Sequence, residues 1–492
     1  MALSKPTMTI DGQQVEAAGG RRLPAVNPYT REEFASIPDA TPGDVDAAVT
    51  AARRAFDNTW SQVPGVERGR LLMRLADLVE AHAEEIGHLE TQDNGKLLRE
   101  TTKQVGFSAR TYRFFAGYAD KLYGLSIPLD DNATLDYTIR EPLGVSALIT
   151  AWNSPMQLLS NKLAPALAAG NTVVIKPSEH ASLTTLRMAD LTREAGFPDG
   201  VINVISGGQE AGTALTSHPG LDHISFTGGV ETGQAVARAA AAHLIPVTLE
   251  LGGKSPNIVF ADANLDNAVT GAIAGIFAAG GQSCIAGSRL LVERSVYDDV
   301  VQRVSARAAE IRLGDPNRPD TEMGPVANQA QFERIQQMIE RGVASGARRT
   351  TTAAVRGTGV DRGYFIPPTV FADVDNGMEI AQQEVFGPVL SIIGFESEDE
   401  AIAIANGTEF GLASAVWTKD ISRAHRVARR LVSGSVWVNT YRKSAVQTPA
   451  GGVRKSGYGR ERGAESLDEF LRTKNVMVDL SDTIDDPFTM RF

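Results

Sequence analysis

VSALITAWNSPMQLLSNKLAPALAAGNTVVIKP, residues 145–177, is the stretch that decides the fold. It holds two short apolar runs, VSALIT and TVVIKP, on either side of the helical pattern LLSNKLAPALAAG. Apolar runs joined by a helix are typical of right-handed βαβ units in a parallel sheet. Helical patterns separate most of the runs that follow, which are VINVIS (201–206), DHISFTG (222–228) and VTLELGG (247–253). The region therefore predicts a parallel sheet covered by helices.

The residues that follow these runs are the candidates for a functional site. In open parallel sheets, ligands bind outside the carboxyl ends of the strands. Asn153 follows the first run, and 176–179, 228–233 and 250–253 end or follow later ones. We expect these segments to lie along one edge of the sheet.

Helical patterns precede this sheet, and a second α/β region follows it. Apolar residues recur at helical spacing in 44–56 and 69–86, and Asn94-Gly95 is a helix stop signal. A chain of 492 residues is too long for one core, so two or three domains are expected. From about residue 255, a helical stretch at 296–311 is accompanied by the strand-like runs RLLVE (289–293), VLSIIGF (389–395), ASAVWT (413–418) and GSVWVNT (434–440).

Composition excludes several classes of function. The net charge of −11 is spread along the chain without a basic tract, so nucleic acid is not an expected partner. The first residues, MALSKPTMTIDGQQ, lack the pattern of a secretory signal, and the most apolar stretch, 268–281, is too short and Gly-rich to span a bilayer. We therefore expect a cytoplasmic protein without membrane contact. One cysteine and seven histidines without metal-ligand spacing predict no metal site.

Two β-like segments lie outside both α/β regions. LDYTIREP (135–142) and TKNVMVDL (473–480) would each expose an edge if left alone. Pairing with another chain is therefore expected.

An ordered series of short motifs is the most informative feature of the chain. It consists of AWNSP (151–155), KPSE (176–179), FTGG (226–229), TLELGGKSP (248–256), GQSC (281–284), EVFGP (384–388) and PAGGVRKSGYGRERG (449–463). In order and spacing, over essentially the whole chain, the series resembles the aldehyde dehydrogenase superfamily, in its NAD(P)-dependent, non-acylating form.

The resemblance implies an α/β fold with a Rossmann-type parallel-sheet cofactor domain, a second α/β catalytic domain and a small β element for bridging and oligomerisation. The expected NAD-binding domain comprises 1–124 and 144–252, and the catalytic domain 253–470. The oligomerisation element comprises 125–143 and 471–492. A homodimer or homotetramer is expected.

The resemblance also assigns three catalytic residues. Cys284 matches the nucleophile, whose attack on an aldehyde gives a thiohemiacetal and, after hydride loss, a thioester. Glu250 matches the base that activates water, and the same carboxylate is a candidate acceptor for the Cys284 proton. A carboxylate between Leu249 and Leu251 is costly to bury without a role, and burial raises its pKa toward a useful range. The amide of Asn153 matches an oxyanion donor that acts with the Cys284 backbone N–H.

The cofactor expected is NAD, with NADP as the alternative. Lys176 and Glu179 match residues that hold the adenosine ribose, and a carboxylate there disfavours a 2′-phosphate. The phosphate turn departs from the family, because Gly229 stands where a serine is usual. The residues expected to contact the cofactor are Trp152, Lys176, Ser178, Glu179, Gly229, Thr232, Gly233, Leu251, Glu384 and Phe386.

The positions that match the substrate tunnel are unusual for their size and polarity. Relatives acting on small aldehydes have aromatics where this chain has small or polar residues, so we expect a wider, more polar tunnel and a bulky, polar or anionic aldehyde. Arg442 and Lys443 would cover its mouth and attract an anion. Ala464 stands where many relatives carry a proton-relaying Glu. The expected lining is Ser154, Asn161, Ala278, Arg442, Lys443, Ser444 and Ala450.

Other functions remain open at this point. A semialdehyde dehydrogenase of a catabolic pathway is a subtype that fits Arg442 and Lys443. A CoA-acylating relative would pass the thioester to a thiol, but many of these lack the base that Glu250 supplies. A non-catalytic binding role is disfavoured by the presence of Asn153, Glu250, Cys284 and Glu384 together. The sequence does not name the aldehyde.

Overall fold

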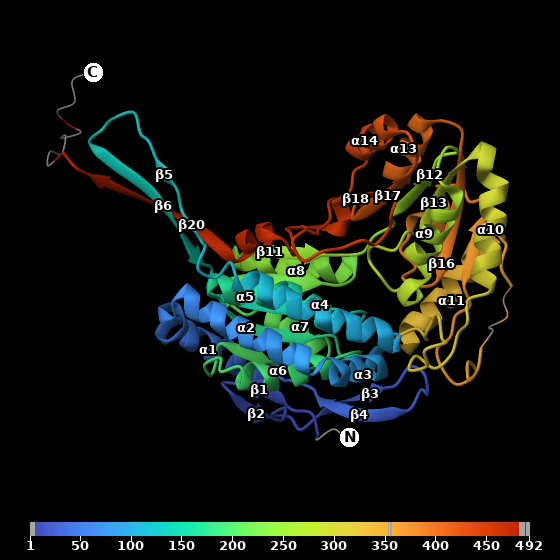
Figure 1. Cartoon of the computed structure of the whole chain (residues 1–492). Coiled ribbons are helices and arrows are strands. Elements are labelled where there is room, and N and C mark those ends of the chain that lie inside the picture. The colour runs from blue at the N-terminus through green and yellow to red at the C-terminus, as the bar shows by residue number, and fades with distance from the viewer. Residues whose placement is uncertain (1–4, 353, 355–356, 482–487, 489–492) are drawn as a thin grey trace.

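The computed structural model describes residues 5–352, 354, 357–481 and 488. Two α/β lobes lie side by side, and a β arm projects from one of them (Figure 1). The α/β fold class predicted from the motifs is confirmed. The predicted domain boundaries stay a prediction, and the last part of the expected 471–492 element, 482–487 and 489–492, lies outside the described residues.

The first lobe is built on the predicted parallel sheet. Its core strands lie in the order β11-β10-β7-β8-β9. The bounds are β7 (Val145–Thr150), β8 (Thr172–Pro177), β9 (Ile202–Val204), β10 (His223–Thr227) and β11 (Val247–Glu250). Antiparallel strands extend both edges: β1 (Met8–Ile10) and β2 (Gln13–Val15) beyond β9, and β19 (Gly457–Tyr458) beyond β11. The pairing of β19 with β11 was not predicted, and it brings a distant segment to the end of β11.

Helices cover both faces of this sheet. One core joins α2, α4, α5 and α6 to the sheet through Leu72, Tyr112 and Leu163. The other joins α1, α7 and α8 to it through Val45 and Phe226. Gly95, with φ of 77°, ends α3 as predicted. The helix expected over 69–86 is two helices that meet at His82. The bounds are α1 (Pro42–Asn58), α2 (Gly65–Ala81), α3 (Ala83–Asn94), α4 (Leu98–Ala116), α5 (Pro155–Ala169), α6 (Leu183–Glu194), α7 (Gln209–Thr216) and α8 (Val230–His243). A hairpin of β3 (Arg22–Val26) and β4 (Glu33–Pro38) lies near the N-terminus.

The second lobe holds a seven-stranded sheet in the order β14-β15-β16-β13-β12-β17-β18. All of its neighbours pair in parallel except β14. The strands are β12 (Pro256–Val259), β13 (Arg289–Glu293), β14 (Arg348–Arg349), β15 (Thr369–Ala372), β16 (Val389–Phe395), β17 (Ala413–Trp417) and β18 (Ser435–Val438). The helices are α9 (Leu265–Phe277), α10 (Tyr297–Ala309), α11 (Gln329–Ala344), α12 (Glu379–Gln382), α13 (Glu398–Asn406) and α14 (Ile421–Arg430).

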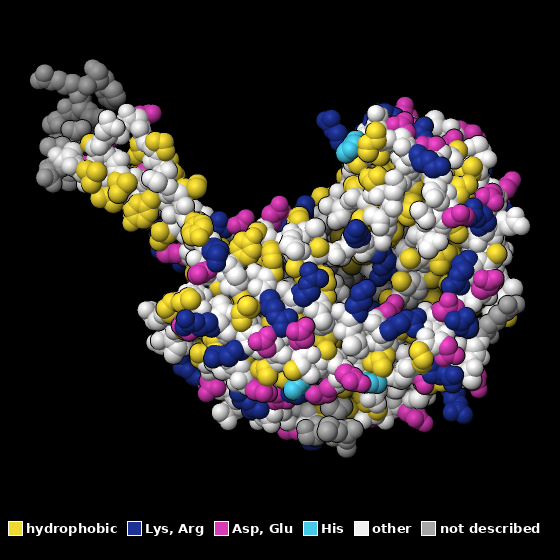
Figure 2. All heavy atoms as spheres, viewed as in Figure 1, with side chains coloured by type: hydrophobic (Ala, Val, Ile, Leu, Met, Phe, Trp, Pro, Cys, Tyr) yellow, Lys and Arg dark blue, Asp and Glu magenta, His cyan; other side chains and the backbone are white. Residues whose placement is uncertain are grey.

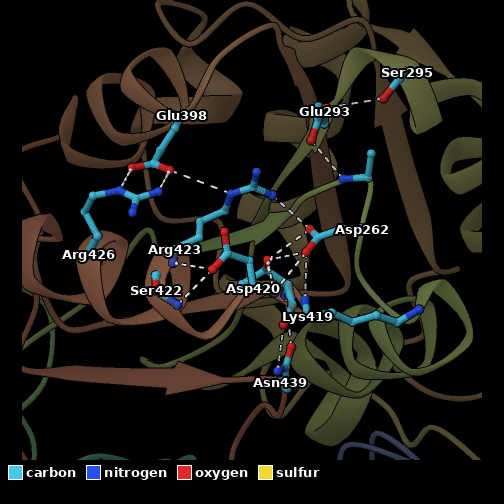
Figure 3. A network of polar contacts seen from close by, with 12 residues as sticks. Asp262, Glu293, Ser295, Glu398, Lys419, Asp420, Ser422, Arg423, Arg426 and Asn439 are labelled. Carbon is cyan, nitrogen blue, oxygen red and sulfur yellow. Dashed lines mark hydrogen bonds and ion pairs between the residues drawn. The ribbon is translucent and has the colours of Figure 1, made fainter.

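A polar network fixes the carboxyl ends of this second sheet (Figure 3). Asp262, just after β12, accepts hydrogen bonds from Thr418, from the backbone of 419–420 and from Arg423. Asp420 caps α14 through two backbone N–H groups. Glu398 of α13 pairs with Arg426 of α14 by two contacts of 2.7 Å. Cys284 and Glu384 lie at the opposite, amino-terminal ends of the strands of this sheet, before β13 and β16.

Buried Arg289 holds the amino end of β13. Its guanidinium donates to the Lys254 carbonyl at 3.0 Å and to the Ala405 carbonyl at 2.7 Å. It also donates to Asn376 at 2.9 Å. These contacts fix the start of β13 against the turn that follows Glu250.

The β arm corrects one expectation. β6 (Thr134–Pro142) and β20 (Leu471–Asp479) pair with each other along their whole length, from Leu471 opposite Pro142 to Asp479 opposite Thr134. β5 (Ser126–Ile127) adds a third strand. The two β-like segments thus satisfy each other, because antiparallel pairing uses the facing edge of both. Within the described residues, the outer edge of β20 is left without a partner strand.

Apolar side chains gather along the arm (Figure 2). Tyr123 is 75% exposed and Met477 63% exposed. The other large apolar side chains exposed on or beside the arm are Leu125, Leu135, Ile139, Val478 and Leu480. No helix among the described residues is long and apolar enough to cross a membrane.

The β11–β19 contact generates a stability prediction. Gly457 has φ of 105°, and a Cβ there would lie 1.9 Å from the Leu249 carbonyl oxygen. We expect Gly457→Ala to destabilise the chain by about 1–3 kcal/mol or more, because it adds both backbone strain and a clash. Thermal unfolding followed by circular dichroism measures the effect.

The matched control is Gly106→Ala within α4 (Leu98–Ala116), where a Cβ would meet nothing within 4 Å. That variant should melt at or slightly above the wild-type temperature, since Ala favours helix over Gly. Equal melting temperatures for Gly457→Ala and the wild type would contradict the importance of this contact.

Candidate active site

Glu250 ends β11 and is buried at the junction of the lobes. Its residue is 8% exposed, and its Oε1 atom has no hydrogen-bond partner among the described residues. Burial, reinforced by the nearby charge of Glu461, raises the pKa of Glu250 to about 8, against the opposing effect of Lys162. The carboxyl is therefore largely protonated at neutral pH and loses its proton in a range useful for a general base.

A buried ion pair lies next to Glu250. Lys162 Nζ contacts Glu461 Oε1 at 2.5 Å and donates to Ser225 at 3.0 Å. Glu461 is held opposite Ala450 by two backbone hydrogen bonds of 2.7 Å. Sequence reasoning missed this pair. Its signal was a lysine inside the apolar pattern of residues 158–170 and a glutamate inside the last motif. Ala464 offers no carboxylate at the position that matches a proton-relaying Glu in many relatives, but Glu461, three residues earlier, lies close enough to act on Glu250.

Cys284 lies in the loop between η2 (Ala278–Gly281) and β13, and it is half-buried. A Cβ on Gly253 would lie 2.4 Å from the Cys284 carbonyl oxygen, so the turn after Glu250 packs directly on the Cys284 backbone. Burial raises the pKa of the Cys284 thiol to about 12, and the charges of Glu250, Glu384 and Glu461 act in the same direction. In this arrangement the thiol holds its proton, so it needs a base to become nucleophilic.

Asn153 reaches the same loop from the end of β7. Its amide nitrogen donates to the Gln282 carbonyl at 3.0 Å, and its amide oxygen has no partner among the described residues. Lys96 Nζ donates to the Asn153 carbonyl at 2.9 Å. The structure therefore brings Asn153, Glu250 and Cys284 to one place.

A cleft of about 710 Å³ lies along the carboxyl ends of the first sheet. Its lining includes six residues of the expected cofactor set: Trp152, Lys176, Ser178, Glu179, Gly229 and Thr232. It also includes residues of α7 that sequence reasoning missed, such as Gln209 and Thr213. These had no signal beyond their position after a strand.

The cleft fits a dinucleotide. α8 begins after Gly229, and no side chain caps it, so its first N–H groups are open to a phosphate. Lys176 is buried, and among the described residues its ammonium donates only to a carbonyl, that of Pro177 at 3.2 Å. An anionic, hydroxyl-rich ligand would satisfy both groups.

The remaining cofactor candidates lie where the lobes meet. Glu384 Oε1 accepts from the Gly253 backbone N–H at 2.9 Å, and burial raises the Glu384 pKa to about 7. Trp152 and Phe386 meet edge to face with ring centroids 5.2 Å apart. Gly233 lies against Leu251, because a Cβ there would be 2.5 Å from that side chain. These residues continue the cleft toward Cys284.

The expected substrate-pocket residues fall into two groups. Ser154 accepts from Lys96 Nζ at 2.6 Å, and buried Asn161 donates to Glu461 at 3.3 Å. Arg442 reaches the Ala278 carbonyl at 3.4 Å. The outer group is more accessible: Lys443 and Ser444 are exposed and Ala450 is half-buried. Arg462, which sequence reasoning missed, donates to Ser444.

Among the described residues, no group of three His, Cys, Asp or Glu side chains could hold a metal ion.

Comparisons with known proteins agree over nearly the whole chain. The model of the aldehyde dehydrogenase family matches residues 15–476. The (Z)-2-((N-methylformamido)methylene)-5-hydroxybutyrolactone dehydrogenase of Acinetobacter baylyi is 47% identical, covering 96% of this chain and 97% of its own. An aldehyde dehydrogenase of Emericella nidulans is 45% identical, covering 96% and 95%. Betaine aldehyde dehydrogenase from Staphylococcus aureus, solved in complex with NAD+, has a TM-score of 0.96 and 40% identity, covering 99% and 97%.

The pKa of Glu250 generates a prediction on stability. Its folded value of about 8 exceeds the ordinary 4.5, so the fold favours the neutral form. The stability that this supplies is complete below about pH 4.5 and is lost as pH rises through 8. Glu250→Gln does not lose stability in this way, because the glutamine side chain does not ionise. We expect its melting temperature to gain on the wild type by roughly 2 °C or more between pH 6 and pH 9.

The control for this measurement is the exposed Glu340→Gln on α11, which should show no pH-dependent difference. A Glu250→Gln advantage that stays constant or shrinks between pH 6 and pH 9 would show that the carboxyl is not held neutral.

Proposed function

Because this chain belongs to the aldehyde dehydrogenase family, we propose that it oxidises an aldehyde to a carboxylate through a thioester on Cys284. Membership confirms the enzyme class and the NAD-type cofactor that the motifs predict. The observation that carries the finer proposal is the packing of the Gly253 turn on the Cys284 backbone, which brings a buried base and the one thiol of the chain together.

The first step is addition of the thiol to the aldehyde. Cys284 sulfur bonds to the carbonyl carbon while its proton passes to the ionised form of Glu250, which its pKa of about 8 makes a stronger base than an ordinary carboxylate. The carbonyl oxygen becomes an oxyanion, to which the Asn153 amide and the Cys284 backbone N–H donate. One such donor is worth roughly 3 kcal/mol in the transition state. Bound NAD supplies the acceptor for the hydride that leaves this carbon.

The second step is hydrolysis of the thioester. Once Glu250 has released the Cys284 proton by way of Glu461, it takes a proton from water and the resulting hydroxide attacks the thioester carbon. The C–S bond then breaks, and Glu250 returns that proton to the Cys284 sulfur as the acid is released. Glu461, paired with Lys162, lies near Glu250 and can accept its proton in turn. Water, rather than a second thiol, is therefore the acceptor we propose, which disfavours the CoA-acylating alternative.

The proposed cofactor contacts follow the cleft. Lys176, Ser178 and Glu179 would hold the adenosine ribose, and the start of α8, with Gly229 and Thr232, would hold the pyrophosphate. Glu384 would hold the nicotinamide ribose, with Phe386 and Trp152 beside the ring.

The proposed substrate is a bulky, polar or anionic aldehyde. Ser154, Ala278, Ser444 and Ala450 are small or polar, and a large aldehyde would compensate for the space. The Acinetobacter relative is named for a hydroxybutyrolactone, a polar compound with more atoms than a simple aldehyde. A semialdehyde dehydrogenase of a catabolic pathway is the subtype that the nearby arginines favour.

Mutation of the two central residues tests the mechanism. Cys284→Ser should lower NADH formation at least ~10³-fold while the protein still folds, because no other thiol is present. Glu250→Gln should give a burst of NADH in stopped-flow mixing and then turnover slowed by ~10²-fold or more. Glu340→Gln, an exposed change of the same kind, should behave as wild type.

Aldehyde oxidation by Cys284→Ser at a near wild-type rate would exclude the thioester. Loss of activity in Glu250→Gln without a burst would place Glu250 at the earlier step, on the Cys284 proton.

The cofactor preference is a separate prediction. Glu179 lines the cleft beside Lys176, and a carboxylate near the ribose repels a 2′-phosphate. We expect kcat/KM to be higher with NAD than with NADP, and Glu179→Ser to narrow the ratio about tenfold. Equal wild-type values for the two cofactors would refute this.

The arm supports a homodimer or homotetramer, as its exposed apolar side chains and the free edge of β20 suit contact with another copy. We expect light scattering at micromolar concentration to give a mass above that of one 52.5 kDa chain. Leu125→Asp with Met477→Asp should lower it. A monomeric wild type would contradict the proposal.

The cytoplasmic location expected from the sequence stays a prediction.

A further inference from the structure

Two arginines near Cys284 lack the carboxylate partners that many surface arginines of this chain have. Arg442 and Arg462 both exert a charge effect on the Cys284 region. Neither has a carboxylate oxygen within 4.0 Å among the described residues, whereas Arg426 and Arg423, for example, both contact Glu398. Both side chains are half-buried. Two partly desolvated, unpaired guanidinium groups beside a nucleophile are an arrangement that an anion would stabilise.

Arg442 is fixed to the Cys284 loop on two sides. Its Nη1 reaches the Ala278 carbonyl at 3.4 Å, a long contact that satisfies little of its donor capacity. The preceding Tyr441 donates its hydroxyl to the carbonyl of Ile285, the residue after Cys284, at 3.0 Å. The loop that carries Arg442 is therefore tied to the nucleophile, so the guanidinium does not depend on a free surface loop for its position.

Arg462 approaches from the other side, next to Glu461. Its Nη1 donates to the Ser444 hydroxyl, and its Nε is buried without a partner among the described residues. Burial lowers the Arg462 pKa, while the charges of Glu461, Glu250 and Cys284 oppose that effect. The Arg462 guanidinium thus has an N–H group without an acceptor in the part of the chain that the structure describes, and it lies close enough to Glu250 and Cys284 for their charges to act on it.

The carboxylates of the site do not cancel these charges at neutral pH. Glu250, with a pKa of about 8, is mostly neutral, and Glu461 is paired with Lys162. Lys96, whose pKa is lowered by burial, donates to the Asn153 carbonyl and to Ser154. Glu384 lies toward the cofactor cleft, bonded to Gly253. None of these carboxylates is within ion-pair distance of Arg442 or Arg462 among the described residues, so both guanidinium groups are left for an anion that enters the site.

We propose that Arg442 and Arg462 form an anion subsite beside Cys284, which holds the carboxylate of a carboxylated aldehyde. The planar fork of each guanidinium suits two-point contact with a carboxylate. This deepens the proposed function and rests on it, because it assigns the semialdehyde class to that same site. Lys443, expected from the sequence to share the role, is exposed and takes no part.

The single thiol of the chain allows a direct test without cofactor or aldehyde. Iodoacetate and iodoacetamide are similar in size, and the same thiolate attacks the carbon of each and displaces iodide. The fraction of the thiol that is ionised therefore cancels in the ratio of the two alkylation rates. We expect the iodoacetate-to-iodoacetamide ratio at Cys284 to exceed that of N-acetylcysteinamide by about tenfold. Arg442→Gln and Arg462→Gln should each lower the ratio at least ~3-fold, and the double variant should bring it to the free-thiol value.

Matched variants separate charge from structure. Lys443→Gln, on the same loop, should keep the wild-type ratio, and Arg462→Lys, which retains the charge, should keep most of it. A wild-type ratio no higher than that of the free thiol would overturn the proposal, as would an effect of Lys443→Gln as large as that of the arginine variants.

A second measurement needs no variant. Succinate should protect wild-type Cys284 from iodoacetamide, while succinamide at the same concentration should not. Equal protection, or none by succinate, would overturn the subsite. If the enzyme oxidises aldehydes but the ratio matches the free thiol, only the subsite falls. If the ratio behaves as expected and no aldehyde is oxidised, the proposed function falls instead.

Discussion

Burial of one carboxyl, that of Glu250, is the constraint on which the rest of the site depends. A carboxylate at the end of an apolar strand costs several kcal/mol unless it is neutral or compensated. Here the carboxyl is held neutral, because burial and the nearby charge of Glu461 raise its pKa to about 8 against the opposing effect of Lys162. β19 pairs with β11 and brings Glu461 close enough to act on Glu250, so the C-terminal part of the chain helps to hold a carboxyl of the first lobe in its neutral form.

The carboxyl ends of strands in the first sheet face the amino ends of strands in the second, and the candidate catalytic residues lie between these two edges. Glu250 and Lys176 end strands of the first sheet, whereas Cys284 and Glu384 precede β13 and β16 of the second. The polar network around Asp262 fixes the far ends of the second sheet (Figure 3), and Arg289 fixes the near end. Because Glu250 and Cys284 each lie next to a strand of a different sheet, the packing of the two sheets sets the position of the base relative to the thiol.

The positive groups near Cys284 show how a shared scaffold can be adapted to one substrate. Lys96, Arg442 and Arg462 come from three different segments, and none of them belongs to the sheets that hold Glu250 and Cys284 in place. Changes at such positions alter what enters the site without disturbing the acid–base groups. Small residues such as Ser154 and Ala278 leave space beside them, and this combination favours a large anion over a small neutral aldehyde.

The sequence by itself determined the parallel sheet from 145 to 250, the strand-like runs of the second lobe, and the motif residues Asn153, Glu250, Cys284 and Glu384. Strand and helix patterns are local, so neighbouring residues are enough to infer them. The motif residues were identified by the order and spacing of the whole series, which resembles that of a known family. Only the tertiary structure placed Lys162 with Glu461, paired β6 with β20, and turned Arg462 toward Cys284. These contacts join segments hundreds of residues apart, and no local pattern specifies which distant charge or strand edge will meet a given residue.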